Sequence, residues 1–484
     1  MYEIDVNREK IAKSFFWKVL ERFFSQGIGM LVQIVLARIL MPEDFGSLAI
    51  IVAFIGYATI FVSSGITTTV IQKKDLDRKD LSTLMTFTLG MASVFYLMLY
   101  FAAPFISSYY NSPLLQPTLR VLALTLFLQG INSVQTGLLQ RQMNFRQLFV
   151  RTMVAAPIAG VIGIYMAQNG FGLWSLVVHA ISNQILVIII MSLDKDCRIP
   201  IGFSRERMKE IFPFTSKIML TFATSGLFDL VRTTMIGKKY SRNDLAYYDK
   251  GLTYSSYVTM LVNQSMGSVL LPAFSRKQDS IVILKGMARR SVKVTSFIMI
   301  PILIAVAVMS RPLIEVLLTE KWLPCAPFLV IYCFLRIPGP ILNIDKQVFY
   351  ALGKSGVNLY YEIGLFIFNF IALFIAIKIN VLAIAIGALI VEVLGTFFIF
   401  IISSKVYEYT IKERFLDMWK PSFGSIVMAV ALYGVSLIGL STLLTLCIQL
   451  LISIIVYLFM AIITKDDDLN YCLSIVKDML NRNK

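Results

Sequence analysis

The sequence predicts an all-α polytopic membrane protein with about 14 transmembrane helices. The first observation is composition: of 484 residues, 57% are hydrophobic and only 15% are charged, with a mean hydropathy of +0.74. The second is that apolar stretches of about 20 residues, long enough to cross a bilayer, recur along the chain. The third is that Lys and Arg concentrate in the short loops between those stretches. A soluble globular domain needs no such balance.

The apolar stretches fall into three groups separated by polar segments. The first six are expected at about 15–40, 45–71, 81–107, 117–139, 147–168 and 172–193. After a polar break at 194–207, six more are expected at about 211–236, 245–272, 286–309, 325–350, 356–378 and 380–403. The polar stretch 404–420 then precedes two final spans at about 422–440 and 443–463.

Loop charge tests this count and predicts the orientation. With the N-terminus in the cytoplasm, 31 Lys and Arg residues fall on the cytoplasmic side, 8 fall outside and 6 lie within spans. Positive residues are retained on the cytoplasmic side of bacterial membrane proteins. We therefore expect a multi-pass protein of the cytoplasmic (inner) membrane with both termini in the cytoplasm.

Several functional classes are disfavoured. The net charge of +16 comes from loops rather than from a basic tail, so nucleic acid is not an expected partner. Five scattered cysteines without a C-x-x-C pair and a single histidine, His179, indicate neither disulfides nor a metal site; His179 is interpreted as a satisfied polar residue between helices. No removable signal peptide and no catalytic motif is found. The sequence therefore predicts no enzyme activity and no cofactor.

Two short matches predict an internal repeat. Residues 38–46, after the first span, resemble residues 238–246, after the seventh, and Asp44 coincides with Asp244 at an offset of 200. Prolines likewise follow the third and ninth spans. Because six spans is an even number, the halves should share one orientation. We expect an N-terminal six-helix lobe at 1–193, a C-terminal six-helix lobe at 194–403, and two additional helices with a cytoplasmic tail at 404–484.

The fourth and tenth spans correspond in this repeat, and both contain helix-breaking or polar residues. The fourth contains Gln129, Gly130, Asn132, Gln135 and Gly137; the tenth contains Arg336, Pro338, Gly339, Pro340, Asn343, Asp345 and Lys346. Interrupted polar helices in matching positions favour a substrate path at the repeat interface. The alternative is that Gly and Pro permit close helix packing.

The first span carries charge at membrane depth. Its uncharged part, 23–37, covers only about 22 Å at 1.5 Å per residue, less than the ~30 Å hydrocarbon core. Lys18, Glu21 and Arg22 lie on one helix face and either face a polar cavity or extend to the membrane surface. A break or close packing is expected at Gly27 and Gly29.

These residues resemble a known family. The start of the chain is similar to polysaccharide-export flippases of the Wzx type, in the multidrug/oligosaccharidyl-lipid/polysaccharide (MOP) exporter superfamily. The similarity is carried by Trp17, Glu21-Arg22, Gln26, Leu36-Ala37-Arg38-Ile39-Leu40 and Pro42-Glu43-Asp44-Phe45-Gly46. It continues through 64–74, 171–174, 246–248, 271–274 and 320–324.

The resemblance implies transbilayer movement of polyprenyl-diphosphate-linked oligosaccharide by alternating access of two lobes, as in lipopolysaccharide O-antigen export. Partners are then the lipid-linked substrate, membrane lipids, and a polysaccharide polymerase and glycosyltransferases. An ion-coupled multidrug antiporter on the same scaffold, and a membrane glycosyl transferase or polymerase, are the alternatives.

A diphosphate head group requires cations at membrane depth. The expected cationic cavity comprises Lys18, Arg22, Arg232, Lys250, Arg336 and Lys346. The acids expected to couple transport to ions, or to pair with these cations, are Glu21, Asp229, Glu362 and Glu392. Arg22 and Arg336 rank highest because each adjoins an expected helix break.

Overall fold

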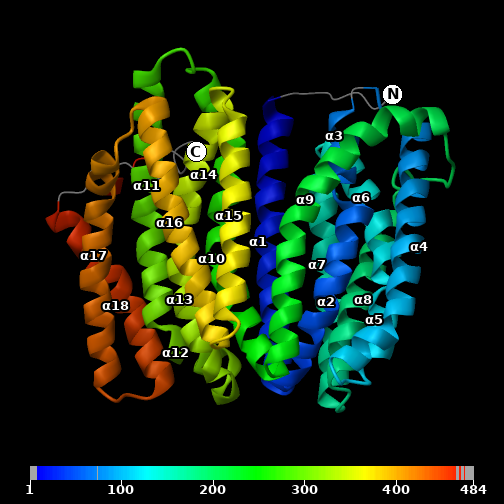
Figure 1. Cartoon of the computed structure of the whole chain (residues 1–484), viewed down its shortest axis with the longest axis horizontal. Helices are drawn as coiled ribbons and strands as arrows, with labels where there is room; N and C mark the ends of the chain where they lie inside the picture. The colour runs from blue at the N-terminus through cyan, green and yellow to red at the C-terminus, as the bar shows by residue number, and fades with distance from the viewer. Residues whose placement is uncertain (1–7, 74, 465–467, 470–473, 475–484) are drawn as a thin grey trace. The chain divides into compact units, whose positions relative to one another are not determined.

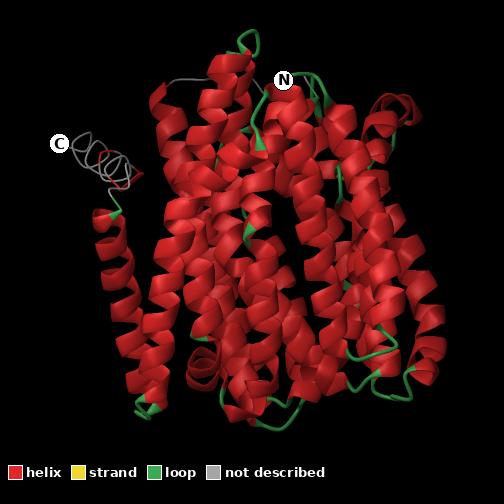
Figure 2. Ribbon diagram, turned by 60° about the vertical axis from the view of Figure 1, so that its left-hand side comes forward, coloured by secondary structure: helices red, strands yellow, loops and turns green. Residues whose placement is uncertain are grey.

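The computed structural model describes residues 8–73, 75–464, 468, 469 and 474. Within these residues every regular element is helical, as Figure 2 shows, which confirms the all-α class. Twelve helical segments of the described chain are long and apolar enough to cross a membrane. Two further long helices, α1 (Arg8–Ile39) and α10 (Arg242–Ser275), carry more charge; the count of fourteen crossings stays a prediction. Residues 1–7 and 475–484, which would place the termini, lie outside the described residues.

The chain divides into two compact units, Met1–Ala246 and Tyr247–Lys484. The first unit ends later than the expected lobe boundary at 193 because helix α9 (Arg205–Lys239) packs against α2 (Pro42–Ser63) and α4 (Arg78–Tyr109). The assignment of 194–403 to a second repeat, and of 404–484 to an addition, stays a prediction.

In the first unit, α1 packs along α7 (Phe145–Gln168), and α7 packs along α8 (Leu173–Ser192) (Figure 1). The remaining helices of this unit are α3 (Ile66–Gln72), α5 (Leu115–Leu122) and α6 (Thr125–Arg141). Both α3 and α4 pack against α6. The first unit thus places α1, α6, α7 and α8 around one another.

In the second unit, three helix pairs pack closely: α11 with α17, α17 with α18, and α15 with α16. Their bounds are α11 (Ile281–Val308), α15 (Ser355–Ala376), α16 (Val381–Tyr407), α17 (Ile411–Leu437) and α18 (Thr442–Ile463). The chain between α11 and α15 forms α12 (Ser310–Leu318), the 3-10 helix η1 (Glu320–Cys325), α13 (Ala326–Arg336) and α14 (Pro338–Ala351). The two final helices therefore pack on α11 and α12 within this unit.

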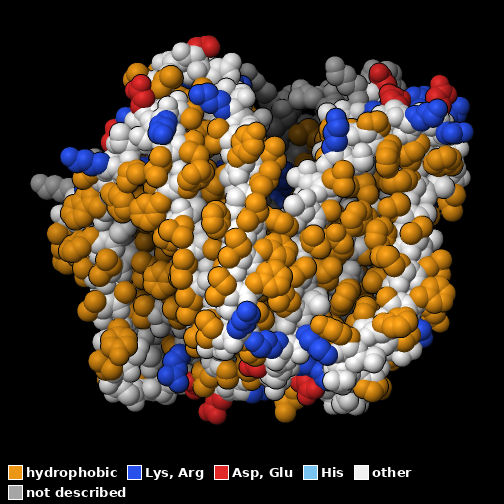
Figure 3. Space-filling model, viewed as in Figure 1, with side chains coloured by type: hydrophobic (Ala, Val, Ile, Leu, Met, Phe, Trp, Pro, Cys, Tyr) orange, Lys and Arg blue, Asp and Glu red, His pale blue; other side chains and the backbone are white. Residues whose placement is uncertain are grey.

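The surface has the chemistry of a membrane protein. On the face shown in Figure 3, hydrophobic side chains cover the middle of each unit, and Lys, Arg, Asp and Glu gather toward the two ends. Many large apolar side chains of the described residues are exposed, such as Phe105 at 77% and Leu437 at 71%. Exposing so much apolar surface to water would be energetically unfavourable. Contact with lipid chains carries no such penalty, because those chains are as apolar as the side chains.

The two similar turns found in the sequence adopt the same local structure. At the start of α2, the Asp44 carboxylate accepts a hydrogen bond of 3.2 Å from the Met41 backbone N–H. At the start of α10, the Asp244 carboxylate accepts one of 3.2 Å from the Ser241 backbone N–H. In each case the carboxylate of an acidic residue accepts a hydrogen bond from a backbone N–H at the helix N-terminus, which has no partner within the helix. This equivalence supports the internal repeat.

A charged cluster joins the start of α9 to the loop between α3 and α4 and to the start of α4. The Lys73 ammonium lies 2.8 Å from the Asp80 carboxylate and 3.1 Å from that of Glu210. Burial lowers the pKa of Lys73, but hydrogen bonds to Asp80 and Glu210 outweigh this effect, so the pKa lies above its ordinary value. Arg207 adds an ion pair to Asp77 at 3.1 Å.

The structure corrects one expected helix break. Helix α1 is continuous from Arg8 to Ile39, so no interruption occurs at Gly27–Gly29. Close packing does not explain these glycines either, because a Cβ at Gly27 or Gly29 would meet no atom within 4 Å. Two isolated glycines cost a helix only about 1 kcal/mol each, which surrounding contacts readily offset.

The other two expected interruptions are present, one at a shifted position. The tenth span breaks at Ile337, between α13 and α14, where Pro338 has no N–H to continue the hydrogen-bond ladder. The fourth span breaks at Ala123–Leu124. Gly130 and Gly137 instead allow close packing: a Cβ there would lie 3.2 Å from Thr88 and 2.9 Å from Val70, respectively.

The start of α2 is expected to tolerate no side chain at Gly46. A Cβ there would lie 1.9 Å from the Arg242 carbonyl oxygen, so Gly46→Ala must displace backbone, and overpacking costs about 1–3 kcal/mol or more. We expect a clearly lower thermal unfolding midpoint of the detergent-purified protein. The matched control is Gly56→Ala in the same helix, where a Cβ meets nothing within 4 Å. Equal midpoints for the two variants would contradict this contact.

Candidate functional site

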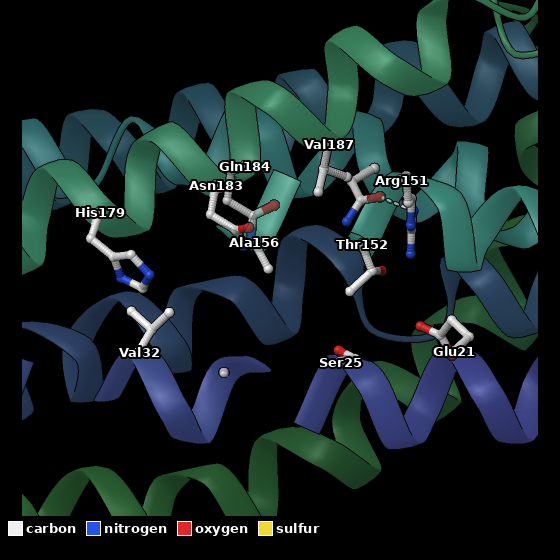
Figure 4. A pocket seen from close by; sticks show the side chains of 12 residues that line it. Glu21, Ser25, Val32, Arg151, Thr152, Ala156, His179, Asn183, Gln184 and Val187 are labelled. Carbon is white, nitrogen blue, oxygen red and sulfur yellow. Dashed lines mark hydrogen bonds between the residues drawn. The ribbon is translucent and has the colours of Figure 1, made fainter. Parts of the chain in front are cut away.

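A polar cavity of about 250 Å³ lies inside the first unit (Figure 4). It is formed by α1, α6, α7 and α8, and its lining comprises Glu21, Ser25, Gly29, Val32, Asn132, Arg151, Thr152, Ala156, His179, Asn183, Gln184 and Val187. Polar and charged side chains make up most of this set, although the surrounding helices are apolar. A polar cavity among membrane helices is a default candidate for a functional site.

Arg151 is the cation of this cavity, and it lies in the second turn of α7. Its Nη1 donates to Asn132 Oδ1 at 2.8 Å and to Thr136 Oγ1 at 3.0 Å, both on α6, and lies 2.8 Å from Met191 Sδ on α8. Its Nε is buried and has no hydrogen-bond partner among the described residues. Arg151 is therefore anchored to α6 and α8, and its Nε is an unused donor.

Glu21 and Arg151 lie at the same end of the cavity in Figure 4. In the described part of the chain no ion pair within 4 Å joins them, and the cavity lies between the two charges. The Gln184 side-chain oxygen is also buried without a hydrogen-bond partner there. A donor, an acceptor and two opposite charges around one space can hold water or a small polar group.

His179 lies at the opposite end of the cavity, above Val32 in Figure 4. A Cβ on Gly163 would lie 2.8 Å from the His179 Cβ, so the glycine lets α8 approach α7 here. No hydrogen bond from the ring occurs among the described residues. His179 lies between helices, as the sequence suggested, and it also lines a polar cavity, which the sequence did not indicate. Gly29 has a related role, because a larger side chain there would occupy the cavity.

In the second unit, Arg336, Lys346, Glu362 and Glu392 form one electrostatic cluster. The Lys346 ammonium lies 2.5 Å from the Glu362 carboxylate. Glu392, half-buried on α16, experiences the charges of Lys346, Glu362 and Arg336. Arg336 is half-buried at the last position of α13, beside the break at Ile337. Glu362 thus pairs with Lys346, which is one of the two roles expected for these acids; that Lys346 lines a substrate cavity stays a prediction.

The other expected cations occupy separate environments. Arg232 forms an ion pair with Asp229 at 2.8 Å, as the sequence suggested. Lys250 is only 5% exposed, and its ammonium lies 5.9 Å from the centres of both the Tyr254 and Trp322 rings. Lys18 is exposed on α1, 5.4 Å from the Phe145 ring centre, and Arg22 is half-buried on the same helix. Whether these residues share one cavity stays a prediction.

A buried ion pair lies next to Lys346. Asp345 on α14 accepts two hydrogen bonds from Arg414 on α17, at 3.0 and 2.6 Å, and both side chains are fully buried. Ser403 donates to the same carboxylate at 2.9 Å, and the Tyr407 hydroxyl also donates to it. The Arg414 guanidinium stacks 4.1 Å from the Tyr409 ring centre. Asp345 is therefore satisfied by α16 and α17.

Sequence reasoning missed the residues that build these sites. Arg151 was counted only among the basic residues of the cytoplasmic side, although it is the seventh residue of α7. Asn132 was noted only as a helix interruption, and Asn183 and Gln184 were not noted. The available signal was the spacing of polar residues 179, 183 and 184 on one face of an otherwise apolar span.

Comparisons with known proteins agree with this architecture. The family model described as polysaccharide biosynthesis protein matches residues 35–327. Succinoglycan biosynthesis transport protein ExoT of Rhizobium meliloti (strain 1021) is 22% identical over 67% of this chain and 66% of its own length, just under two thirds. Lipopolysaccharide biosynthesis protein WzxC of Escherichia coli (strain K12) is 22% identical over 89% of this chain and 88% of its own.

Two solved structures share the fold. The lipid II flippase MurJ, in an inward closed conformation, has a TM-score of 0.77 at 16% identity, covering 93% of this chain and 99% of its own. An inward-facing multidrug resistance MATE family transporter of the MOP superfamily has a TM-score of 0.64 at 14% identity, covering 80% and 97%. At these identities the similarity shows the fold alone.

The Asp345–Arg414 pair is expected to be essential for stability. Removing one partner of a buried pair leaves an uncompensated charge and costs about 3–5 kcal/mol. Asp345→Asn and Arg414→Gln should each lower the thermal midpoint strongly, and the double variant should lose less than the sum. The control is Asp229→Asn, whose carboxylate is 66% exposed and whose removal should change little. Single variants as stable as the control would refute this assignment.

Proposed function

Because this chain belongs to the family of polysaccharide biosynthesis proteins, we propose that it is a flippase for polyprenyl-diphosphate-linked oligosaccharide in the bacterial cytoplasmic membrane. Its relatives include a succinoglycan transport protein and a lipopolysaccharide biosynthesis protein. The fold is similar to that of MurJ, which is named a lipid II flippase, and this similarity supports a lipid-linked saccharide as the cargo. Glycosyltransferases would supply the cargo, and a polymerase would receive it. No bond is made or broken in this role.

The observation that carries the proposal is the polar cavity within apolar helices. A sugar head group that enters hydrocarbon without partners costs about 2–7 kcal/mol for each unsatisfied polar group. Arg151, Asn132 and Gln184 provide partners at membrane depth in the first unit. In the second unit, Arg336 and Lys346 provide cations for a diphosphate. Arg22, Lys18, Arg232 and Lys250 complete the proposed cationic set.

The four acidic residues of the expected site differ in whether they form ion pairs. Asp229 and Glu362 form ion pairs, so their role is to hold Arg232 and Lys346. Glu21 and Glu392 are half-buried and form no ion pair in the described part of the chain. We therefore assign coupling to protons or sodium to these two rather than to the paired acids.

A multidrug antiporter is the second candidate, favoured by the fold shared with the MATE transporter. A cavity for cationic drugs is expected to be acidic, whereas this one holds Arg151 beside a single carboxylate, Glu21. Drug efflux by cells expressing the protein, without transport of lipid-linked sugar, would favour the antiporter.

Transport is expected to depend on the cations. Purified protein in vesicles should move lipid-linked oligosaccharide, extracted from cells that carry the gene, to the opposite leaflet, where a membrane-impermeant glycosidase releases the sugar. Arg22→Gln, Arg151→Gln and Arg336→Gln should each slow this about tenfold or more, because a hydrogen bond to a charged group contributes about 1.5–3 kcal/mol. The control is Lys378→Gln in the exposed loop between α15 and α16. If all three variants transport at the wild-type rate, the proposed role of the cations is wrong. If the wild-type protein transports no lipid-linked oligosaccharide, the proposed flippase function is wrong.

The proposed orientation has an independent test. Single cysteines at Gln278 and Lys378, both exposed in loops of the second unit, are introduced after the native cysteines are replaced. A membrane-impermeant maleimide should label position 378 in intact cells and position 278 only after permeabilisation. The reverse pattern would invert the topology.

A further inference from the structure

An apolar groove of about 360 Å³ lies between α15 and α16 of the second unit. Four of its lining residues are exposed aromatic or aliphatic side chains: Tyr360 at 76%, Phe368 at 62%, Leu394 at 63% and Phe398 at 54%. The groove runs from Tyr360 toward Phe368 along α15. Because both helices are membrane-spanning segments, lipid chains surround it.

Two glycines create the space. A Cβ on Gly364 would meet no atom within 4 Å, so any larger side chain there would project into open space beside α15. A Cβ on Gly395 would lie 2.7 Å from Leu365 and 3.3 Å from the Tyr361 hydroxyl. Gly395 thus brings α16 close to α15, and Gly364 leaves the groove empty of protein atoms.

One polar group lines this groove without a partner. Tyr361 is only 3% exposed, and its hydroxyl makes no hydrogen bond to any described residue. The hydroxyl lies beside Gly395 in the groove, and the Lys346 ammonium lies 5.5 Å from the centre of the Tyr361 ring. An unpaired buried hydroxyl is costly, so a hydrogen-bonding ligand at this point would be stabilising.

The polar end of the groove lies nearer the start of α15 than its apolar end does. Tyr361 follows the start of α15 by six residues, or about 9 Å along the helix axis. Tyr is enriched toward the ends of membrane spans, where its hydroxyl can meet polar groups. The apolar end, at Phe368 and Val391, lies deeper in the hydrocarbon. The groove therefore has the polarity of a membrane amphiphile, with its head at Tyr361 and its tail at Phe368.

We propose that this groove binds the isoprenoid chain of a polyprenyl diphosphate, with the diphosphate at the Tyr361 hydroxyl and within reach of Lys346. This inference rests on the proposed function and names where the carrier lipid stays while its sugar moves. Burial of the chain gives little affinity by itself, because surrounding lipid is equally apolar. Selection comes from the anionic head, which accepts a hydrogen bond from Tyr361 and takes the place of the Glu362 carboxylate as the partner of Lys346.

The test uses a polyprenyl diphosphate that carries a photoreactive diazirine in its chain. It is added to the full-length protein in nanodiscs of phosphatidylethanolamine and phosphatidylglycerol, and labelled peptides are identified by mass spectrometry. Labelling is expected in residues 360–368 and 391–398, and excess unlabelled polyprenyl diphosphate should remove it. A diazirine-bearing phosphatidylglycerol tests the other lipid source.

Two substitutions separate the tail from the head. Gly364→Leu should fill the groove and reduce labelling at least tenfold. Gly434→Leu on α17 makes the same change at an exposed glycine with no atom within 4 Å of its Cβ position, and should leave labelling unchanged. Tyr361→Phe keeps the ring but removes the donor, and should weaken competition by the diphosphate about tenfold. Competition by the uncharged polyprenol should stay the same.

Three results would overturn the proposal. They are full labelling of Gly364→Leu, equal labelling by the phosphatidylglycerol probe that polyprenyl diphosphate does not displace, and labelling confined to other helices. Thermal midpoints confirm that each variant is folded. If the wild-type protein transports lipid-linked oligosaccharide but the probe labels other residues, the proposed groove is wrong and the proposed flippase function is retained. If the wild-type protein transports none, the proposed flippase function is wrong.

Discussion

Every charge within the hydrocarbon must find its partner inside the protein, and this constraint organises the structure. Asp345 meets it through Arg414, Ser403 and Tyr407, and Lys346 meets it through Glu362. Lys250 lies between aromatic rings, whose negative faces attract the ammonium. Arg151 meets the constraint through α6 and α8. The Nε atoms of Arg151 and Arg414 both lack a hydrogen-bond partner among the described residues, and what distinguishes Arg151 is the polar cavity beside it.

Glycines have three different structural effects in this chain. Gly46 permits contact between two backbones, and Gly163 permits contact between a helix and the His179 side chain. Gly29 and Gly364, by contrast, face open space at a cavity and a groove, respectively. In membranes, helix association relies on close packing rather than on the hydrophobic effect. For Gly29 and Gly364, the cavity or groove that each one lines, rather than close packing, accounts for the absence of a side chain.

Much of the fold could be predicted from local sequence. Hydropathy alone indicates membrane helices, and Pro338 identifies the break at Ile337 because proline acts on its own backbone. The similar turns at Asp44 and Asp244 were recognisable because their hydrogen bonds are made within three residues. The sites were less accessible. Arg151 joins a helix 19 residues away and Asp345 joins one 69 residues away, and no local pattern encodes either contact. The absence of a break at Gly27–Gly29 likewise depends on neighbours that the sequence does not show.

The distance in sequence between Asp345 and Arg414 has a consequence for biosynthesis. Ribosomes add about 5–20 residues per second, so Asp345 is made about 3–14 s before Arg414, which follows it by 69 residues. During this interval the carboxyl group of α14 lacks its guanidinium partner. The second unit can therefore complete its assembly only after α17 has been inserted. A nascent chain that stops before Arg414 keeps an unneutralised acid in the membrane, which is a feature that cellular quality control can recognise.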